Sequence, residues 1–92
     1  MKDTIRTLHP EKKQGVNISR EKYELICKAI MTALHSQNEM TFMNLSRAVE
    51  KQVGVNFEGS VTWYVTTVKL DLEARGTIKR VPHSRPQLLR LA

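Results

Sequence analysis

The sequence predicts an α+β fold that is mainly α, with three helices followed by a C-terminal β-hairpin. Apolar residues recur at helical spacing in three separate segments, and each segment follows a residue that can cap a helix. After the third segment, Gly76 offers a stop, and two short apolar runs then flank a turn bounded by Pro82 and Pro86. A chain of 92 residues has room for one such domain.

The first helix is expected over residues 20–35. Ser19 is a good N-cap, and Ile18 before it is placed to pack on Tyr23 as a hydrophobic staple. A single cysteine cannot form an internal disulfide, and Cys27 is interpreted as a small apolar side chain on the buried stripe. That stripe consists of Tyr23, Ile26, Cys27, Ile30 and Leu34.

The second helix is expected to begin after Thr41 and to end at Gly54, a residue typical of helix C-termini. Its apolar face consists of Leu45, Ala48, Val49 and Val53. Residues 39–42 are also candidates for a short strand that would complete a sheet with the C-terminal hairpin.

The third helix is expected to begin at Ser60, with an apolar face made of Val61, Tyr64, Val65, Val68 and Leu72. Because the segment is rich in β-branched residues, a strand over residues 61–68 is the alternative. We reject the strand because the helical period continues to Leu72, and because Arg75 lies where a helix C-terminus favours a cation.

The C-terminal hairpin is expected to pair strands at residues 78–81 and 88–91. Alternation directs Ile78, Leu89 and Leu91 toward the helices and leaves Lys79 and Arg90 outward. Three helices and such a hairpin make a winged helix-turn-helix domain, in which the hairpin is the wing. We assign residues 19–92 to it. Residues 1–18 show no sustained period and are predicted to be an extended N-terminal arm that docks through apolar side chains.

The charge of the chain is concentrated at its two ends. The formal net charge is +6 and the sequence pI is about 9.8, which favours polyanionic partners. Residues 59–92 carry six Lys or Arg against two acids, residues 1–18 carry four against two, and residues 19–58 are balanced. Acid pairs such as Asp71 and Glu73 are interpreted as solvated surface charge.

The segment from Leu72 to Gln87 resembles the helix-to-wing junction of bacterial winged helix-turn-helix domains, where a helix ends in a Leu-to-Gly turn and an Ile opens the wing. Over most of its length the chain also resembles a family of small uncharacterised bacterial proteins that has no established activity. That resemblance is carried by Leu8-His-Pro through Lys13-Gln-Gly, by Tyr23, by Trp63 through Gly76, and by the proline-bounded wing. The resemblance implies the winged-helix fold and leaves the function open.

Duplex DNA is the predicted partner. In a DNA-binding winged helix the third helix enters the major groove, and the wing reaches the neighbouring backbone or minor groove, where Lys and Arg neutralise phosphates. The predicted nucleic-acid-binding residues are Thr62, Thr66, Lys69, Lys79, Arg80, His83, Arg85 and Arg90. The exposed face of the helix holds no Arg, Asn or Gln for bidentate base recognition, so base-specific readout is expected to be weak. The competing interpretation is a solvated basic hairpin that keeps the protein soluble.

The same helix carries an apolar strip, which suggests an alternative function as a protein-interaction or dimerisation module. Trp63 and Leu70 form the strip, and the predicted interface residues on this face are Trp63, Thr67, Leu70 and Ala74. Either the N-terminal arm or a second copy of the chain could cover this strip, and the sequence favours neither.

We predict no catalytic residues, no cofactor, no metal and no small-molecule ligand. The histidines at 9, 35 and 83 lie in different segments without partners at metal-ligand spacing, and the glycines do not form a phosphate-binding loop. The sequence has no apolar run long enough to span a bilayer and no signal-peptide pattern, so the protein is expected to be cytoplasmic and not an enzyme.

Overall fold

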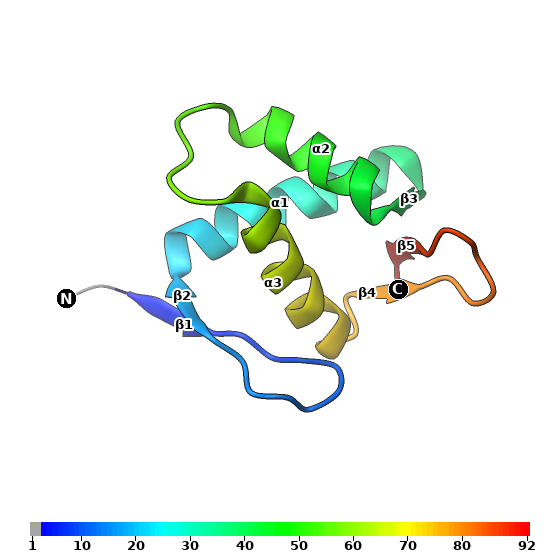
Figure 1. Ribbon diagram of the computed structural model, residues 1–92, viewed down its shortest axis with the longest axis horizontal. Helices are drawn as coiled ribbons and strands as arrows, with labels where there is room; N and C mark the ends of the chain where they lie inside the picture. Colours follow the sequence, from blue (N-terminus) through cyan, green and yellow to red (C-terminus); the bar gives the residue numbers. More distant parts are fainter. Residues whose placement is uncertain (1–2) are drawn as a thin grey trace.

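The computed structural model describes residues 3–92 and contains three helices and two small antiparallel sheets, with roughly half of the chain helical (Figure 1). Residues 1 and 2 of the predicted arm lie outside the described residues. The elements in chain order are β1 (Thr4–Arg6), β2 (Asn17–Ser19), α1 (Arg20–Gln37), β3 (Glu39–Thr41), α2 (Phe42–Val53), α3 (Val61–Ala74), β4 (Ile78–Arg80) and β5 (Leu88–Leu91).

The three helices begin at the predicted caps. Ser19, Thr41 and Ser60 each accept a hydrogen bond from the backbone N–H three residues further on. Gly54 closes α2 with φ of 78°, as the sequence predicts. Helix α1 runs two residues beyond the predicted end, because Asn38 adopts φ of 66° and donates its N–H to the carbonyl of Leu34. Residues 61–68 are helical, so the strand alternative is wrong.

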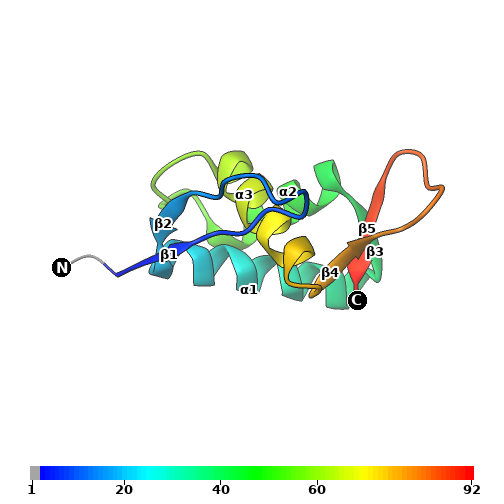
Figure 2. The same ribbon diagram turned by 90° about the horizontal axis from the view of Figure 1, so that it is seen from below.

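One hydrophobic core joins the helices to the three-stranded sheet. Its fully buried side chains come from α1, α2, α3, β4 and β5, and the largest are Ile26, Ile30, Leu34, Leu45, Val49, Val65, Val68, Ile78 and Leu89. Figure 2 shows α1 on one side of the molecule, with α3 and the N-terminal segment on the other.

The C-terminal hairpin forms part of a three-stranded antiparallel sheet with the order β3-β5-β4. Strand β3 confirms the strand expected at residues 39–42. Met40 pairs with Leu89, and Ile78 pairs with Leu91. The inward positions of Ile78 and Leu89 are confirmed, because both side chains are buried, while the outward residues of these strands are exposed.

The N-terminal segment contains two strands that the sequence does not predict. β1 pairs antiparallel with β2, with Ile5 opposite Ile18, and the N–H of Arg20 donates to the carbonyl of Asp3. Each strand has only three residues, which is too short for an alternating pattern to be recognised. The connecting residues 7–16, here called the N-terminal loop, pass the C-terminal end of α3 (Figure 1).

Candidate nucleic-acid interface

The connection between β4 and β5, residues 81–87, is held by its own hydrogen bonds. The N–H of Val81 donates to the carbonyl of Leu88, and the Ser84 hydroxyl donates to the carbonyl of Val81 at 2.8 Å. Ser84 Oγ also accepts from the N–H of Leu88, and the Gln87 amide donates to the Val81 carbonyl at 2.9 Å. The roles of Ser84 and Gln87 were not predicted from the sequence, although both are small or amide-bearing polar residues in a turn, where such bonds are common. The loop therefore has a defined shape.

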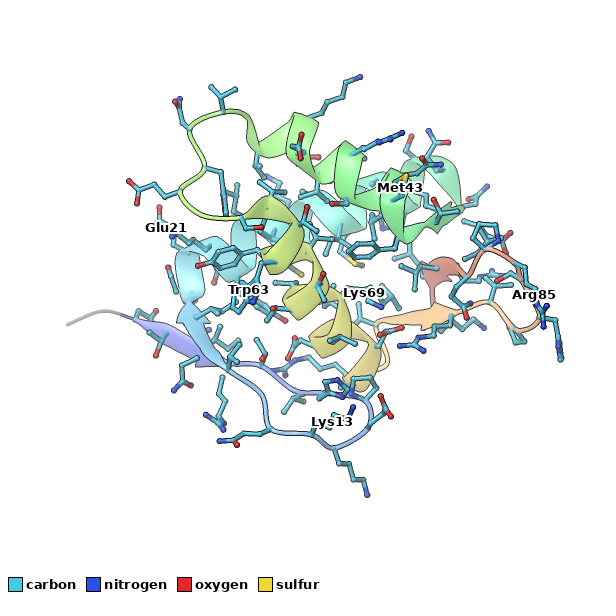
Figure 3. The ribbon with its side chains drawn as sticks, in the orientation of Figure 1. Lys13, Glu21, Met43, Trp63, Lys69 and Arg85 are labelled. Atoms are coloured by element: carbon cyan, nitrogen blue, oxygen red, sulfur yellow. The ribbon has the colours of Figure 1, made fainter. Side chains whose placement is uncertain are left out.

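This loop and the sheet beside it present basic side chains to solvent. His83 and Arg85 are exposed at the tip, and His83 has φ of 61°. Lys79 is exposed on β4, opposite Arg90 on β5. Lys79, His83 and Arg85 form no ion pair with any residue in the range 3–92. Figure 3 shows Arg85 at the outer edge of the loop, far from the labelled Trp63.

The other three predicted cations are paired with carboxylates. Glu73 accepts from Arg80 Nε at 2.8 Å and lies 3.5 Å from Lys69 Nζ. Arg90 lies 3.8 Å from a carboxylate oxygen of Glu39. The interpretation of Glu73 as solvated charge is wrong: its side chain is 6% exposed, and it connects α3 to β4. The hydrogen bond from Arg80 to Glu73 raises the pKa of the Arg80 guanidinium.

The outward face of α3 offers hydroxyls rather than charge. Thr62 and Thr66 are exposed, and the Thr66 hydroxyl donates to the carbonyl of Thr62 at 2.9 Å. Lys69 is 13% exposed and lies over the ring of Phe42 as well as near Glu73, so little of its side chain is accessible to a ligand. Of the three residues predicted on this helix to bind nucleic acid, the two threonines are the accessible ones.

The apolar strip on α3 is most exposed at Trp63. The Trp63 side chain packs edge-on against Tyr64, with ring centroids 4.9 Å apart, and Trp63 remains 46% exposed. Thr67, Leu70 and Ala74 are half-buried. Ala74 and residues of the N-terminal loop together line a hollow of about 650 Å³, so the loop reaches the C-terminal end of the strip.

Asp71 is fully buried and holds three parts of the chain together. Its Oδ1 accepts from the backbone N–H of Leu8 at 2.8 Å, and its Oδ2 accepts from the hydroxyl of Tyr23. The same Oδ2 accepts from Arg75 Nε at 2.8 Å. The interpretation of Asp71 as surface charge is therefore wrong. Asp71 follows Tyr64 by seven residues and so lies on the same line of the helix, a spacing that could have revealed its burial.

Burial near Asp71 keeps two titratable side chains neutral. Desolvation, strengthened by the hydrogen bond to Asp71, raises the pKa of Tyr23 well above its ordinary range. Burial, together with the charge of Asp71, also raises the pKa of the Cys27 thiol. A thiol with a raised pKa is a poor nucleophile, which agrees with a packing role for Cys27.

The Tyr23 hydroxyl should make the fold less stable at alkaline pH. Because the native state keeps this proton while the unfolded chain loses it near pH of about 10, the free energy of unfolding should fall as the pH rises above that value. Below it the contribution is fully present. Urea unfolding at several pH values should show that the stability difference between the wild type and Tyr23→Phe shrinks from about pH 8 to about pH 11. A difference that stays constant over this range would contradict the expected linkage.

Within residues 3–92 no three His, Cys, Asp or Glu side chains are grouped so that they could hold a metal ion. None of the helices described is both long and apolar enough to cross a membrane.

Comparison with known proteins identifies a family whose function is unknown. No curated protein and no solved structure matches the chain. A family model described as a family of unknown function, DUF6958, matches residues 4–89, a range that begins with β1 and ends within β5. The chain therefore belongs to this family of unknown function.

Proposed function

We propose that this protein is a winged-helix domain that binds duplex DNA through the cations of its C-terminal hairpin. The order of elements from α1 to β5 supports the proposal: a helix, a short strand, two helices and a hairpin whose second strand pairs with the short strand. In this arrangement the hairpin is the wing and α3 is the helix that faces the groove.

The observation that carries the proposal is a like-charge pair on an ordered hairpin. Lys79 and Arg90 are directly opposite each other in the register, and both are exposed. Like charges at such positions destabilise a sheet. Arg90 has a carboxylate oxygen of Glu39 3.8 Å away on its other side, but Lys79 has no acidic partner among residues 3–92. A phosphate near these residues would relieve the repulsion. Arg85 extends the positive charge to the hairpin tip, where the imidazole of His83 is also exposed.

The contacts we propose are a reduced form of the set expected from sequence. Lys79, His83, Arg85 and Arg90 contact the DNA backbone, while Thr62 and Thr66 provide hydroxyls from α3. Lys69 and Arg80 act indirectly, because their pairing with Glu73 fixes the hairpin relative to the helix. With no bidentate base-reading side chain on the exposed face of α3, preference among sequences comes from DNA shape.

A salt titration of binding to a random-sequence duplex tests the proposal. The logarithm of the binding constant should fall linearly with the logarithm of salt concentration, with a slope of about −0.9 for each phosphate neutralised. The double variant Lys79→Ala, Arg85→Ala should reduce the magnitude of this slope by about 1.8, because two contacts are lost. Fluorescence anisotropy of a labelled duplex measures both slopes.

Lys28→Glu is the matched control, because it changes the net charge by the same amount as the double variant. Lys28 is exposed on α1, the helix on the opposite side of the molecule (Figure 2). The control should retain the wild-type slope. Failure of the wild type to bind at low salt would rule out the proposed function. An equal change of slope in both variants would show that binding depends on net charge and not on the hairpin.

A partner surface centred on Trp63 has weaker support. Trp63 is exposed, but Thr67, Leu70 and Ala74 are half-buried, so the apolar area available is small. We therefore place the function in the cations and not in the strip.

A further inference from the structure

The N-terminal loop is a second ordered loop with basic side chains. The N–H of Thr7 donates to the carbonyl of Val16 at 2.9 Å, and the N–H of Val16 donates to Thr7 Oγ1 at 3.0 Å, so the base of the loop is closed. Inside it, the N–H of Lys12 donates to the carbonyl of His9 at 2.9 Å and forms a turn. The loop therefore presents Lys12 and its neighbour Lys13 in a defined conformation.

This loop lies against the C-terminal end of α3 and beside the C-terminal hairpin. Asp71 holds its backbone at Leu8, as described above. A second hollow, of about 290 Å³, has Pro10 and Glu11 on one wall and Lys79 and Arg80 on the other. Figure 2 shows the tips of the N-terminal loop and of the hairpin on the same side of the molecule, opposite α1. A ligand that contacts one tip from that side can therefore reach the other.

Acids on this side of the molecule already have partners. Asp71 is paired with Arg75, Glu73 with Lys69 and Arg80, and Glu11 lies 3.8 Å from Lys13. Four exposed cations on these two loops and their strands have no ion pair with any residue from 3 to 92. They are Arg6, Lys12, Lys79 and Arg85. The surplus positive charge is thus divided between the two loops.

Lys12 adopts a backbone conformation that is unfavourable for lysine. Lys12 has φ of 61°, in the left-handed region that is strained for a residue with a Cβ and that glycine adopts freely. His83, at the tip of the other hairpin, has the same φ of 61°. Both turns therefore hold a basic side chain at a position where glycine would remove the strain. Retained strain of this kind is a mark of functional sites.

We propose that the N-terminal loop is a second DNA-backbone contact, with Lys12 as its principal phosphate ligand and Lys13 beside it. This inference rests on the proposed function of the C-terminal hairpin. The duplex then contacts the protein at both loops that flank the C-terminal end of α3, and Asp71 sets the position of one of them through Leu8.

The variant Lys12→Gly separates a binding role from a structural one. Glycine relieves the left-handed strain, so the midpoint of thermal unfolding should stay unchanged or rise. The magnitude of the salt slope for duplex binding should fall by about 0.9, which is roughly an eightfold loss of affinity at about 0.1 M salt. Lys12→Arg should retain the wild-type slope, and Lys28→Ala, which removes one positive charge from α1, should do the same.

The outcomes distinguish this inference from the proposed function. If the wild type binds and the Lys79, Arg85 double variant flattens the slope while Lys12→Gly does not, the second contact is wrong and the first stands. If Lys12→Gly lowers stability, Lys12→Asn serves in its place, because asparagine tolerates positive φ and carries no charge. An unchanged salt slope for Lys12→Asn would then overturn the proposal. Equal losses for Lys12→Gly and Lys28→Ala would also overturn it.

Discussion

Replacing Asp71 with alanine should lower the free energy of unfolding by about 3 kcal/mol. The substitution leaves the Tyr23 hydroxyl and the Leu8 N–H, the donors of two partly buried hydrogen bonds, without their acceptor. A donor left unsatisfied on burial costs about 1–3 kcal/mol. Arg75 loses its carboxylate as well, but its side chain is 40% exposed and can be solvated by water. Urea unfolding should show a lower midpoint at an unchanged dependence on denaturant.

The control for Asp71→Ala is Glu24→Ala, which removes an exposed acid from α1. Surface substitutions of this kind change stability by no more than about 0.5 kcal/mol. Asp71→Ala and Tyr23→Phe should be non-additive in combination, because they remove the two ends of one hydrogen bond. A loss at Asp71 as small as that at Glu24 would mean that the buried carboxylate does not connect the N-terminal loop to the helices.

Replacing Gly15 with alanine should detach the N-terminal loop from the helices. A Cβ at this position would lie 1.7 Å from the carbonyl oxygen of Thr7 and 2.7 Å from its carbon, so the backbone must shift. The hydrogen bonds between Thr7 and Val16 would break, and we expect a cost of about 2 kcal/mol, typical of overpacking. Hydrogen exchange should show loss of protection at the amides of Thr7 and Leu8, with the amides of α3 still protected.

Gly54→Ala is the matched control for Gly15→Ala. Gly54 has φ of 78°, and a Cβ there would meet nothing within 4 Å, so its substitution costs only the conformational strain, about 1 kcal/mol. That variant should leave the Thr7 and Leu8 amides protected. Exchange that is unchanged at Thr7 in Gly15→Ala would show that the loop can accommodate the methyl group and that the steric argument is wrong.

Local signals predicted the helices and the C-terminal hairpin. The helix starts depend on a hydroxyl that bonds three residues along, at Ser19, Thr41 and Ser60, and that interaction is encoded within a few residues. The inward and outward residues of β4 and β5 follow from alternation with a period of two. These parts of the structure can be predicted without knowing which residues lie across the domain.

The parts that could not be predicted depend on distant partners. Asp71 is buried because Leu8 and Tyr23, which are 63 and 48 residues away in the sequence, supply its donors. Glu73 is buried because the hairpin returns Arg80 to it. For the candidate interface, composition identified the cations, but which of them are free and which are paired depends on packing that no local pattern contains.

The hydrogen bonds of Ser84 and Gln87 fix the loop between β4 and β5 through contacts within the loop itself. A segment that is already ordered loses little conformational entropy when it docks, so association should need no folding step. Its rate would then be governed by diffusion and by attraction between opposite charges, which increases as the ionic strength falls. For the proposed DNA contact, the stiffness of this small loop would make the rate of association, as well as the affinity, depend on salt concentration.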